Sequence, residues 1–177
     1  MMRTSFLLAA LLAFPATGKI PALPVAASVD LERYMGTWHE IAYMPNFPQK
    51  GCRDTTVHYT LNDAGAFDLV NTCWKGEKYK EYAGAARRVD PASTAKFRVK
   101  FFLFFGGDYW ITDLDPDYRW AVVGAPGRDQ LWIISRERTL DDAVYQEILA
   151  RARSIGFDTG KLTRTIVTGR SSPAPRP

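Results

Sequence analysis

The chain has 177 residues, of which 46% are hydrophobic, 13% aromatic and 24% charged, and its formal net charge is +4. It has the size of one domain and enough apolar residues for a core, which excludes a disordered polyelectrolyte. Its lysines and arginines are scattered rather than clustered, so no nucleic-acid partner is expected.

The first residues have the three sections of a secretory signal peptide. Arg3 precedes an apolar run from Phe6 to Phe14, and small residues follow at 16–18. No later run reaches the roughly twenty apolar residues of a membrane helix. We therefore expect export, and a soluble protein in the periplasm or outside the cell.

Segments without periodicity flank the central part of the chain, and we expect both to be mobile. No cysteine near the signal offers a site for lipid attachment, so no lipid anchor is expected. The expected divisions are a signal peptide at 1–18, a leader at 19–28, the folded domain at 29–167 and a disordered tail at 168–177.

In the central part, short runs rich in aromatic and β-branched residues are separated by clusters of Gly, Pro, Asn and Asp. This spacing is typical of antiparallel sandwiches and barrels. Phe97, Val99 and Phe101 alternate with Lys or Arg, which gives that strand one apolar and one wet face. The eight expected strands cover residues 37–44, 53–61, 66–74, 79–89, 95–102, 108–114, 119–124 and 130–136.

One helix is expected after the eighth strand. Thr139 and Asp142 resemble a capping box, and a short ninth strand is expected at 163–167. The apolar stripe of the helix consists of Val144, Ile148, Ala152 and Ile155. The expected fold is all-β: an eight-stranded up-and-down antiparallel barrel with one C-terminal α-helix packed outside, because closure removes unpaired strand edges.

In an up-and-down barrel, strand parity brings Gly36-Thr37-Trp38, the turn 115–118 and Arg136 to the same end. A guanidinium stacked on an indole would seal that end, and such a shielded contact contributes on the order of 1 to 2 kcal/mol. The expected structural residues of the closed end are Gly36, Trp38, Asp115 and Arg136. The alternative is that Trp38 and Arg136 occupy separate parts of the core.

On these motifs the chain resembles the lipocalin family, in particular its bacterial and apolipoprotein D branches, from about residue 29 to 167. Two departures are Pro116, which adds a residue to the second signature, and His39, which follows the signature Trp38 where the family often has Tyr. The resemblance implies binding and transport or storage of a hydrophobic ligand, a long-chain fatty acid or lysophospholipid, with no cofactor.

Counting by twos from the motifs predicts which side chains line the barrel. Their make-up is apolar and aromatic with a few polar groups, as expected of a pocket for a small molecule. The expected ligand-binding residues are Ala42, Val57, Tyr59, Leu69, Asn71, Tyr82, Phe97, Val99, Phe101, Tyr109, Trp132 and Ile134.

The same alternation would arise if the barrel were filled, so a second hypothesis is an interaction module for a protein or membrane. The aromatic run Phe101 to Phe105 supports it, because a loop at 101–107 would expose apolar surface for peripheral membrane contact. A third hypothesis is an enzyme. Its only imidazole bases would be His39 and His58, which have outward parity, so neither catalysis nor a metal site is expected.

Glu40 also counts inward, where an ionised carboxylate is unfavourable unless it is paired. Either Arg88 is its partner, or Glu40 sits low in the barrel as a structural hydrogen-bond acceptor.

The only cysteines, Cys52 and Cys73, favour one disulfide in an oxidising compartment, the alternative being two free thiols. If the hairpin turn is Asn62-Asp63, the two face each other directly. A longer turn through Gly65 makes the pair diagonal, which requires a bulge or local bend.

Overall fold

The protein is described here by a computed structural model, which describes residues 21–101, 106–171 and 173. The predicted signal peptide and residues 102–105 of the expected aromatic loop lie outside the described residues. The strands are β1 (Gly36–Tyr43), β2 (Cys52–Leu61), β3 (Phe67–Lys75), β4 (Lys78–Arg88), β5 (Lys96–Phe101), β6 (Gly106–Leu114), β7 (Trp120–Gly124), β8 (Leu131–Ser135) and β9 (Thr163–Arg164). The helices are α1 (Leu31–Tyr34), α2 (Asp142–Ser154) and the short 3₁₀ helix η1 (Thr159–Lys161).

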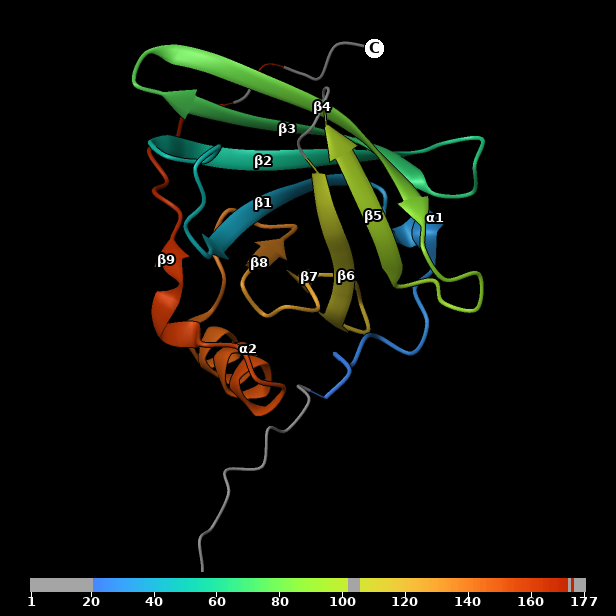
Figure 1. Ribbon diagram of the computed structural model, residues 1–177. Helices are drawn as coiled ribbons and strands as arrows, with labels where there is room; N and C mark the ends of the chain where they lie inside the picture. The colour runs from blue at the N-terminus through green and yellow to red at the C-terminus, as the bar shows by residue number, and fades with distance from the viewer. Residues whose placement is uncertain (1–20, 102–105, 172, 174–177) are drawn as a thin grey trace, which may run out of the picture.

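The predicted barrel is confirmed. The strands pair antiparallel in the order β2-β3-β4-β5-β6-β7-β8-β1-β9, and β1 also pairs with β2, which closes the sheet on itself. Each of the eight predicted strands is present, with ends that differ by at most two residues. Helix α2 packs outside the barrel, while α1 lies at the opposite end of β1 from β9 (Figure 1).

The start of α2 differs from the expected one. Asp141 is the N-cap, and its side chain accepts hydrogen bonds from the amides of Ala143 and Val144. The expected capping residue, Thr139, lies two residues before Asp141. Asp141 caps the helix instead, because it is close enough to accept hydrogen bonds from the first free amides. The stripe on α2 packs Ile148 and Ala152 against the barrel wall.

Buried side chains form two clusters on the two faces of the barrel wall. The inner cluster includes Trp38, Tyr59, Phe67 and Phe97, which are nearly or fully buried. The outer cluster joins β1, β7 and β8 to α2. Alternation along each strand therefore divides apolar residues between a barrel interior and a helix contact.

Both flanking segments contact the barrel where the structure describes them. Leu23 is buried in the outer cluster, and the Ala26 amide donates to the Ile111 carbonyl. At the other end, the Asp54 carboxylate accepts hydrogen bonds from the amides of Thr168 and Gly169. These contacts hold the described parts of both flanking segments against the barrel.

Candidate ligand-binding site

The closed end is built around Arg136. Its guanidinium lies 3.8 Å from the Trp38 ring centroid and donates to the carbonyls of Thr37, Arg33 and Met35 at 2.7 to 2.9 Å. Trp38 is fully buried, so the contact is shielded from water. The predicted stacking of Arg136 on Trp38 is therefore present, and Arg136 also fixes the turn between α1 and β1.

Gly36 and Asp115 complete this end of the barrel. Gly36 has φ +89°, which favours glycine, and a Cβ there would lie 3.5 Å from the Arg136 guanidinium. The buried Asp115 carboxylate accepts hydrogen bonds from the Arg119 side chain and from the amides of Asp117 and Arg119. These hydrogen bonds, first of all those from the Arg119 side chain, lower the pKa of Asp115. All four residues predicted for the closed end lie there.

Helix α1, which the sequence analysis missed, covers this end of the barrel. Asp30 caps it by accepting from the Arg33 amide, and the Tyr34 side chain is fully buried. The Trp38 indole donates to the Tyr34 carbonyl at 2.8 Å. The Asp30 N-cap before Leu31 and Tyr34, the two apolar residues of the turn, is the signal that would have indicated it, but so short a helix depends on its tertiary contacts.

Above the plug, three tyrosine hydroxyls form a chain. Tyr109 contacts both Tyr34 and Tyr59, each with an oxygen–oxygen distance of 2.7 Å. The rings pack with Phe67, whose centroid lies 5.1 Å from that of Tyr59 and 5.5 Å from that of Tyr109. Burial raises the pKa of all three phenols, so they stay protonated at neutral pH. This set, here called the tyrosine floor, is Tyr34, Tyr59 and Tyr109.

The predicted lining residues divide by depth. Six of them are buried in the inner cluster: Val57, Tyr59, Leu69, Phe97, Val99 and Ile134. Phe101, Tyr109 and Trp132 pack against that cluster but keep part of their surface exposed, and Asn71 is also partly exposed. Tyr82, opposite Asn71 in the sheet, is 39% exposed. Apart from Tyr109, which lies at the tyrosine floor, the inward side chains that keep exposed surface lie toward the open end.

Ala42 was expected inside, and this was wrong. It packs in the outer cluster, on the α2 side of the wall. A bulge between Glu40 and Ala42 shifts the register against β8, so Glu40 pairs with Ile134 and Ala42 with Ile133. One extra residue in a strand reverses the alternation beyond it, and a count by twos from Trp38 therefore fails here.

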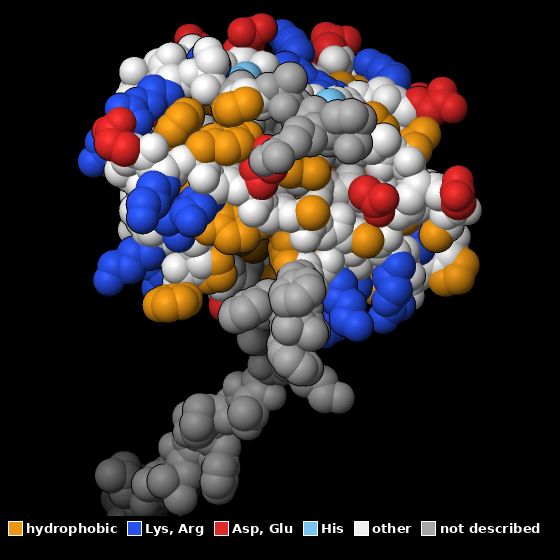
Figure 2. Space-filling model, turned by 90° about the horizontal axis from the view of Figure 1, so that it is seen from above, with side chains coloured by type: hydrophobic (Ala, Val, Ile, Leu, Met, Phe, Trp, Pro, Cys, Tyr) orange, Lys and Arg blue, Asp and Glu red, His pale blue; other side chains and the backbone are white. Residues whose placement is uncertain are grey.

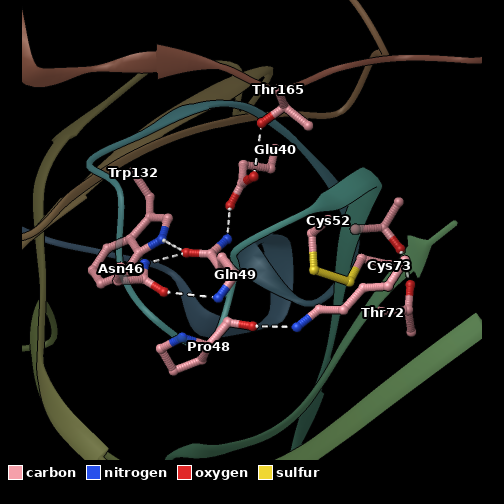
Figure 3. The surroundings of a disulfide bond; sticks show 11 residues. Glu40, Asn46, Pro48, Gln49, Cys52, Thr72, Cys73, Trp132 and Thr165 are labelled. Carbon is pink, nitrogen blue, oxygen red and sulfur yellow. Dashed lines mark hydrogen bonds between the residues drawn. A yellow bond between two sulfur atoms is a disulfide. The ribbon is translucent and has the colours of Figure 1, made fainter.

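Glu40 is buried and serves as a hydrogen-bond acceptor, as the second hypothesis predicted, but one of its partners, Gln49, belongs to the β1–β2 segment. Thr165 donates to one carboxylate oxygen at 2.7 Å, and Gln49 donates to the other (Figure 3). Burial raises the pKa of Glu40, while these hydrogen bonds act in the opposite direction. The hypothesis of a partner at Arg88 was wrong, since the two carboxylate oxygens of Glu40 accept from Thr165 and Gln49.

Gln49, which sequence reasoning did not single out, anchors the segment between β1 and β2. Its side-chain oxygen accepts from the Trp132 indole at 3.0 Å, and its amide nitrogen reaches Glu40 (Figure 3). The segment is fixed a second time by Lys75, which donates to the Pro48 carbonyl at 2.8 Å. Trp132 thus contributes one face to the barrel interior and its N–H to the segment at the open end.

The predicted disulfide between Cys52 and Cys73 is confirmed, with a Cα–Cα distance of 5.4 Å. The longer turn was the correct alternative, because Leu61 pairs with Phe67 and Cys52 pairs with Lys75. The cysteines are therefore diagonal. A register shift between Arg53 and Thr56 accompanies this arrangement, as the geometry required.

Basic side chains gather near this disulfide. Lys78 and Lys80 are exposed on β4, and Lys75 precedes the β3–β4 turn. Lys and Arg side chains gather along the left edge of Figure 2, the side on which the β3–β4 turn lies in Figure 1. The open end therefore combines partly exposed aromatic side chains with positive charge.

Neither histidine lies in the inner cluster. His58 contacts the Thr37 hydroxyl at 2.9 Å, and His39 lies opposite Thr56 and Ser135 in the sheet. Across the described ranges, no group of three or more His, Cys, Asp or Glu side chains is placed to hold a metal ion. No helix within those ranges is long and apolar enough to span a bilayer.

Comparison with known proteins agrees with this architecture. The model of the Lipocalin-like domain matches residues 29–166. Temperature-induced lipocalin-1 of Arabidopsis thaliana is 38% identical over 152 residues, covering 81% of this chain and 82% of the relative. Outer membrane lipoprotein Blc of Escherichia coli is 37% identical over 139 residues, covering 77% and 78%. Among solved structures, insecticyanin from Manduca sexta superposes with a TM-score of 0.70 at 18% identity, covering 86% and 88%. The sealed barrel, its motifs and these matches together place the chain in the lipocalin family, whose members bind small hydrophobic ligands.

Proposed function

We propose that this protein carries a long-chain amphiphile with an anionic headgroup, a fatty acid or a lysophospholipid, without performing chemistry on it. The observation that carries the proposal is the gradient of exposure inside the barrel. Trp38 and Phe97 are fully buried, whereas Phe101 and Trp132 keep accessible surface. An apolar lining that opens toward one end suits an acyl chain that enters there.

The charge at the open end supports an anionic headgroup. Lys75 lies over the Tyr82 ring with its Nζ 6.0 Å from the centroid, and Lys80 pairs in the sheet with Cys73. Lysine side chains at an aqueous rim attract carboxylate or phosphate while the chain stays in the interior. The proposed orientation is therefore chain inside and headgroup at the rim.

The decisive experiment is native mass spectrometry of the purified protein, followed by organic extraction and lipid identification. A carrier should release an acidic lipid with one acyl chain and rebind it after delipidation. Recovery of no lipid, together with no binding of added hexadecanoic acid or lysophosphatidic acid, would contradict the proposal.

Contact with a membrane is a second candidate, and Phe47 is the observation that favours it. Its side chain is 86% exposed beside Lys50, in the segment held by Gln49 at the open end. An apolar side chain next to a cation suits the surface of an anionic bilayer. Co-sedimentation with phosphatidylglycerol vesicles should fall for Phe47→Ala and stay unchanged for Leu61→Ala, an exposed apolar residue beside the β2–β3 turn.

We also propose that the protein is exported. Residues 1–18 support this, because they have the charged, apolar and small-residue sections of a secretory signal peptide. N-terminal sequencing of protein recovered from the periplasm or medium should give a mature chain beginning near Lys19. Recovery of full-length protein from the cytoplasm alone would contradict it.

A further inference from the structure

The tyrosine floor carries one more proton than its hydrogen bonds use. Three phenols supply three O–H groups, but only two contacts join them, Tyr34 to Tyr109 and Tyr59 to Tyr109. Each contact uses one hydrogen. One phenolic O–H of the floor is therefore left to donate elsewhere.

The position of the three residues indicates where that donor points. Tyr34 and Tyr59 have almost no exposed surface, at 0% and 3%. Tyr109 is the central member and the partly exposed one. If Tyr34 and Tyr59 both donate to Tyr109, the Tyr109 O–H is free to point up the barrel. Two accepted hydrogen bonds also polarise that O–H and make it a stronger donor.

The surroundings favour an uncharged acceptor. Tyr109 packs against the inner cluster, with its ring next to Phe67 and its backbone paired with Phe97. The nearby cation Arg136 is occupied by three backbone carbonyls. A carboxylate held by one phenol in such an environment would keep most of its desolvation cost, whereas a hydroxyl or ketone oxygen would not.

The distance from the rim to the tyrosine floor determines which carbon of the ligand carries that oxygen. Tyr109 pairs with Phe97, and Phe97 pairs with Arg88 of β4. Lys80 at the rim lies eight residues from Arg88 in β4, roughly 26 Å of strand, or roughly 20 Å along the axis of a tilted barrel. A long-chain acid with its headgroup at Lys80 thus brings its far end to the floor.

We infer that the tyrosine floor is a polar subsite for the inner end of the ligand, selecting acyl chains that carry a hydroxyl or ketone oxygen at or near the ω carbon. The inference rests on the proposed carrier function and adds a second recognition point to it. A plain chain leaves the surplus donor unpaired or bonded to a trapped water. An ω-oxygenated chain accepts from it directly.

The test compares hexadecanoic acid with its ω-hydroxy derivative on the delipidated full chain, by isothermal titration. The ratio of the two dissociation constants is measured for wild type, Tyr109→Phe and Tyr145→Phe. The last variant removes a phenol from α2 in the outer cluster and serves as the matched control. We expect Tyr109→Phe to reduce the preference for the ω-hydroxy acid by roughly two- to tenfold, and Tyr145→Phe to leave it unchanged.

Because the ratio is taken within one variant, a general loss of stability cancels. A second measurement needs only wild type: the ω-hydroxy acid should bind more tightly than an acid hydroxylated at mid-chain. Equal ratios in wild type and Tyr109→Phe, or tighter binding of the mid-chain isomer, would overturn the inference and leave the carrier function standing. Binding of neither parent nor derivative would overturn both.

Discussion

The two ends of this barrel use similar residues for opposite purposes. At the closed end, Trp38 is fully buried beneath Arg136, which donates hydrogen bonds to three backbone carbonyls. At the open end, Trp132 keeps exposed surface, and its N–H holds Gln49. An indole with a polar partner thus forms a plug at the closed end, where Arg136 stacks on the buried Trp38. At the rim, Trp132 donates to Gln49 and stays partly exposed. We therefore expect substitutions at the plug to affect stability most, and substitutions at the rim to affect stability less.

The largest expected effect lies at the plug. Trp38→Ala should lower the free energy of unfolding by about 3 to 5 kcal/mol, since it removes a buried aromatic and the surface on which Arg136 stacks. Tyr82→Ala at the rim should cost less than about 1 kcal/mol, because Tyr82 is 39% exposed. Urea denaturation of both variants measures the difference. Similar losses would mean that the two ends are not energetically distinct.

The disulfide ranks next. Replacing both Cys52 and Cys73 by Ser should cost about 3 kcal/mol, because the bond closes a loop with a sequence separation of 21. Urea midpoints of the variant and of wild type with and without reductant provide the measurement. The reduced wild type should match the variant. A wild type insensitive to reductant would contradict a stabilising role for the bridge.

The rim is tested by ligand affinity. Trp132→Ala should weaken hexadecanoic acid binding by roughly tenfold, as expected for an aromatic anchor, while Lys100→Ala on the outer face should not change it. Gln49→Ala is the matched control, because it removes the partner of the Trp132 indole and keeps the ring. If Gln49→Ala weakens binding as much as Trp132→Ala, the segment, and not the ring, determines affinity.

The smallest effect concerns pH. Burial raises the pKa of Glu40 above its usual value of 4.5, so the folded state binds this proton more tightly than the unfolded state does. Its contribution to stability is therefore complete below about pH 4.5 and is lost as pH rises through the higher folded pKa. The free energy of unfolding of wild type and of Glu40→Gln should be measured from pH 4 to 7. As pH increases, wild type should become less stable relative to Glu40→Gln. A difference that does not vary with pH would contradict the raised pKa.

The sequence determined by itself the features that rest on local alternation and on spacing. Phe97, Val99 and Phe101 point inward as counted, because β5 contains no bulge. Strand parity alone brings Trp38 and Arg136 to the same end of an up-and-down barrel, and the structure shows that they stack there. The disulfide was predictable because the two cysteines have only each other as partners.

The tertiary structure alone decided the features that depend on an irregularity or on a distant partner. Ala42 faces α2 because one bulge reverses the alternation, and nothing in the residues near Glu40 indicates a bulge. Tyr34 reaches its buried position through a helix too short to form without Trp38 and the barrel beneath it. Gln49 and Thr165 meet at Glu40 from separations of 9 and 125 residues. Periodicity describes neighbours along a strand, whereas these contacts arise only once the barrel has closed.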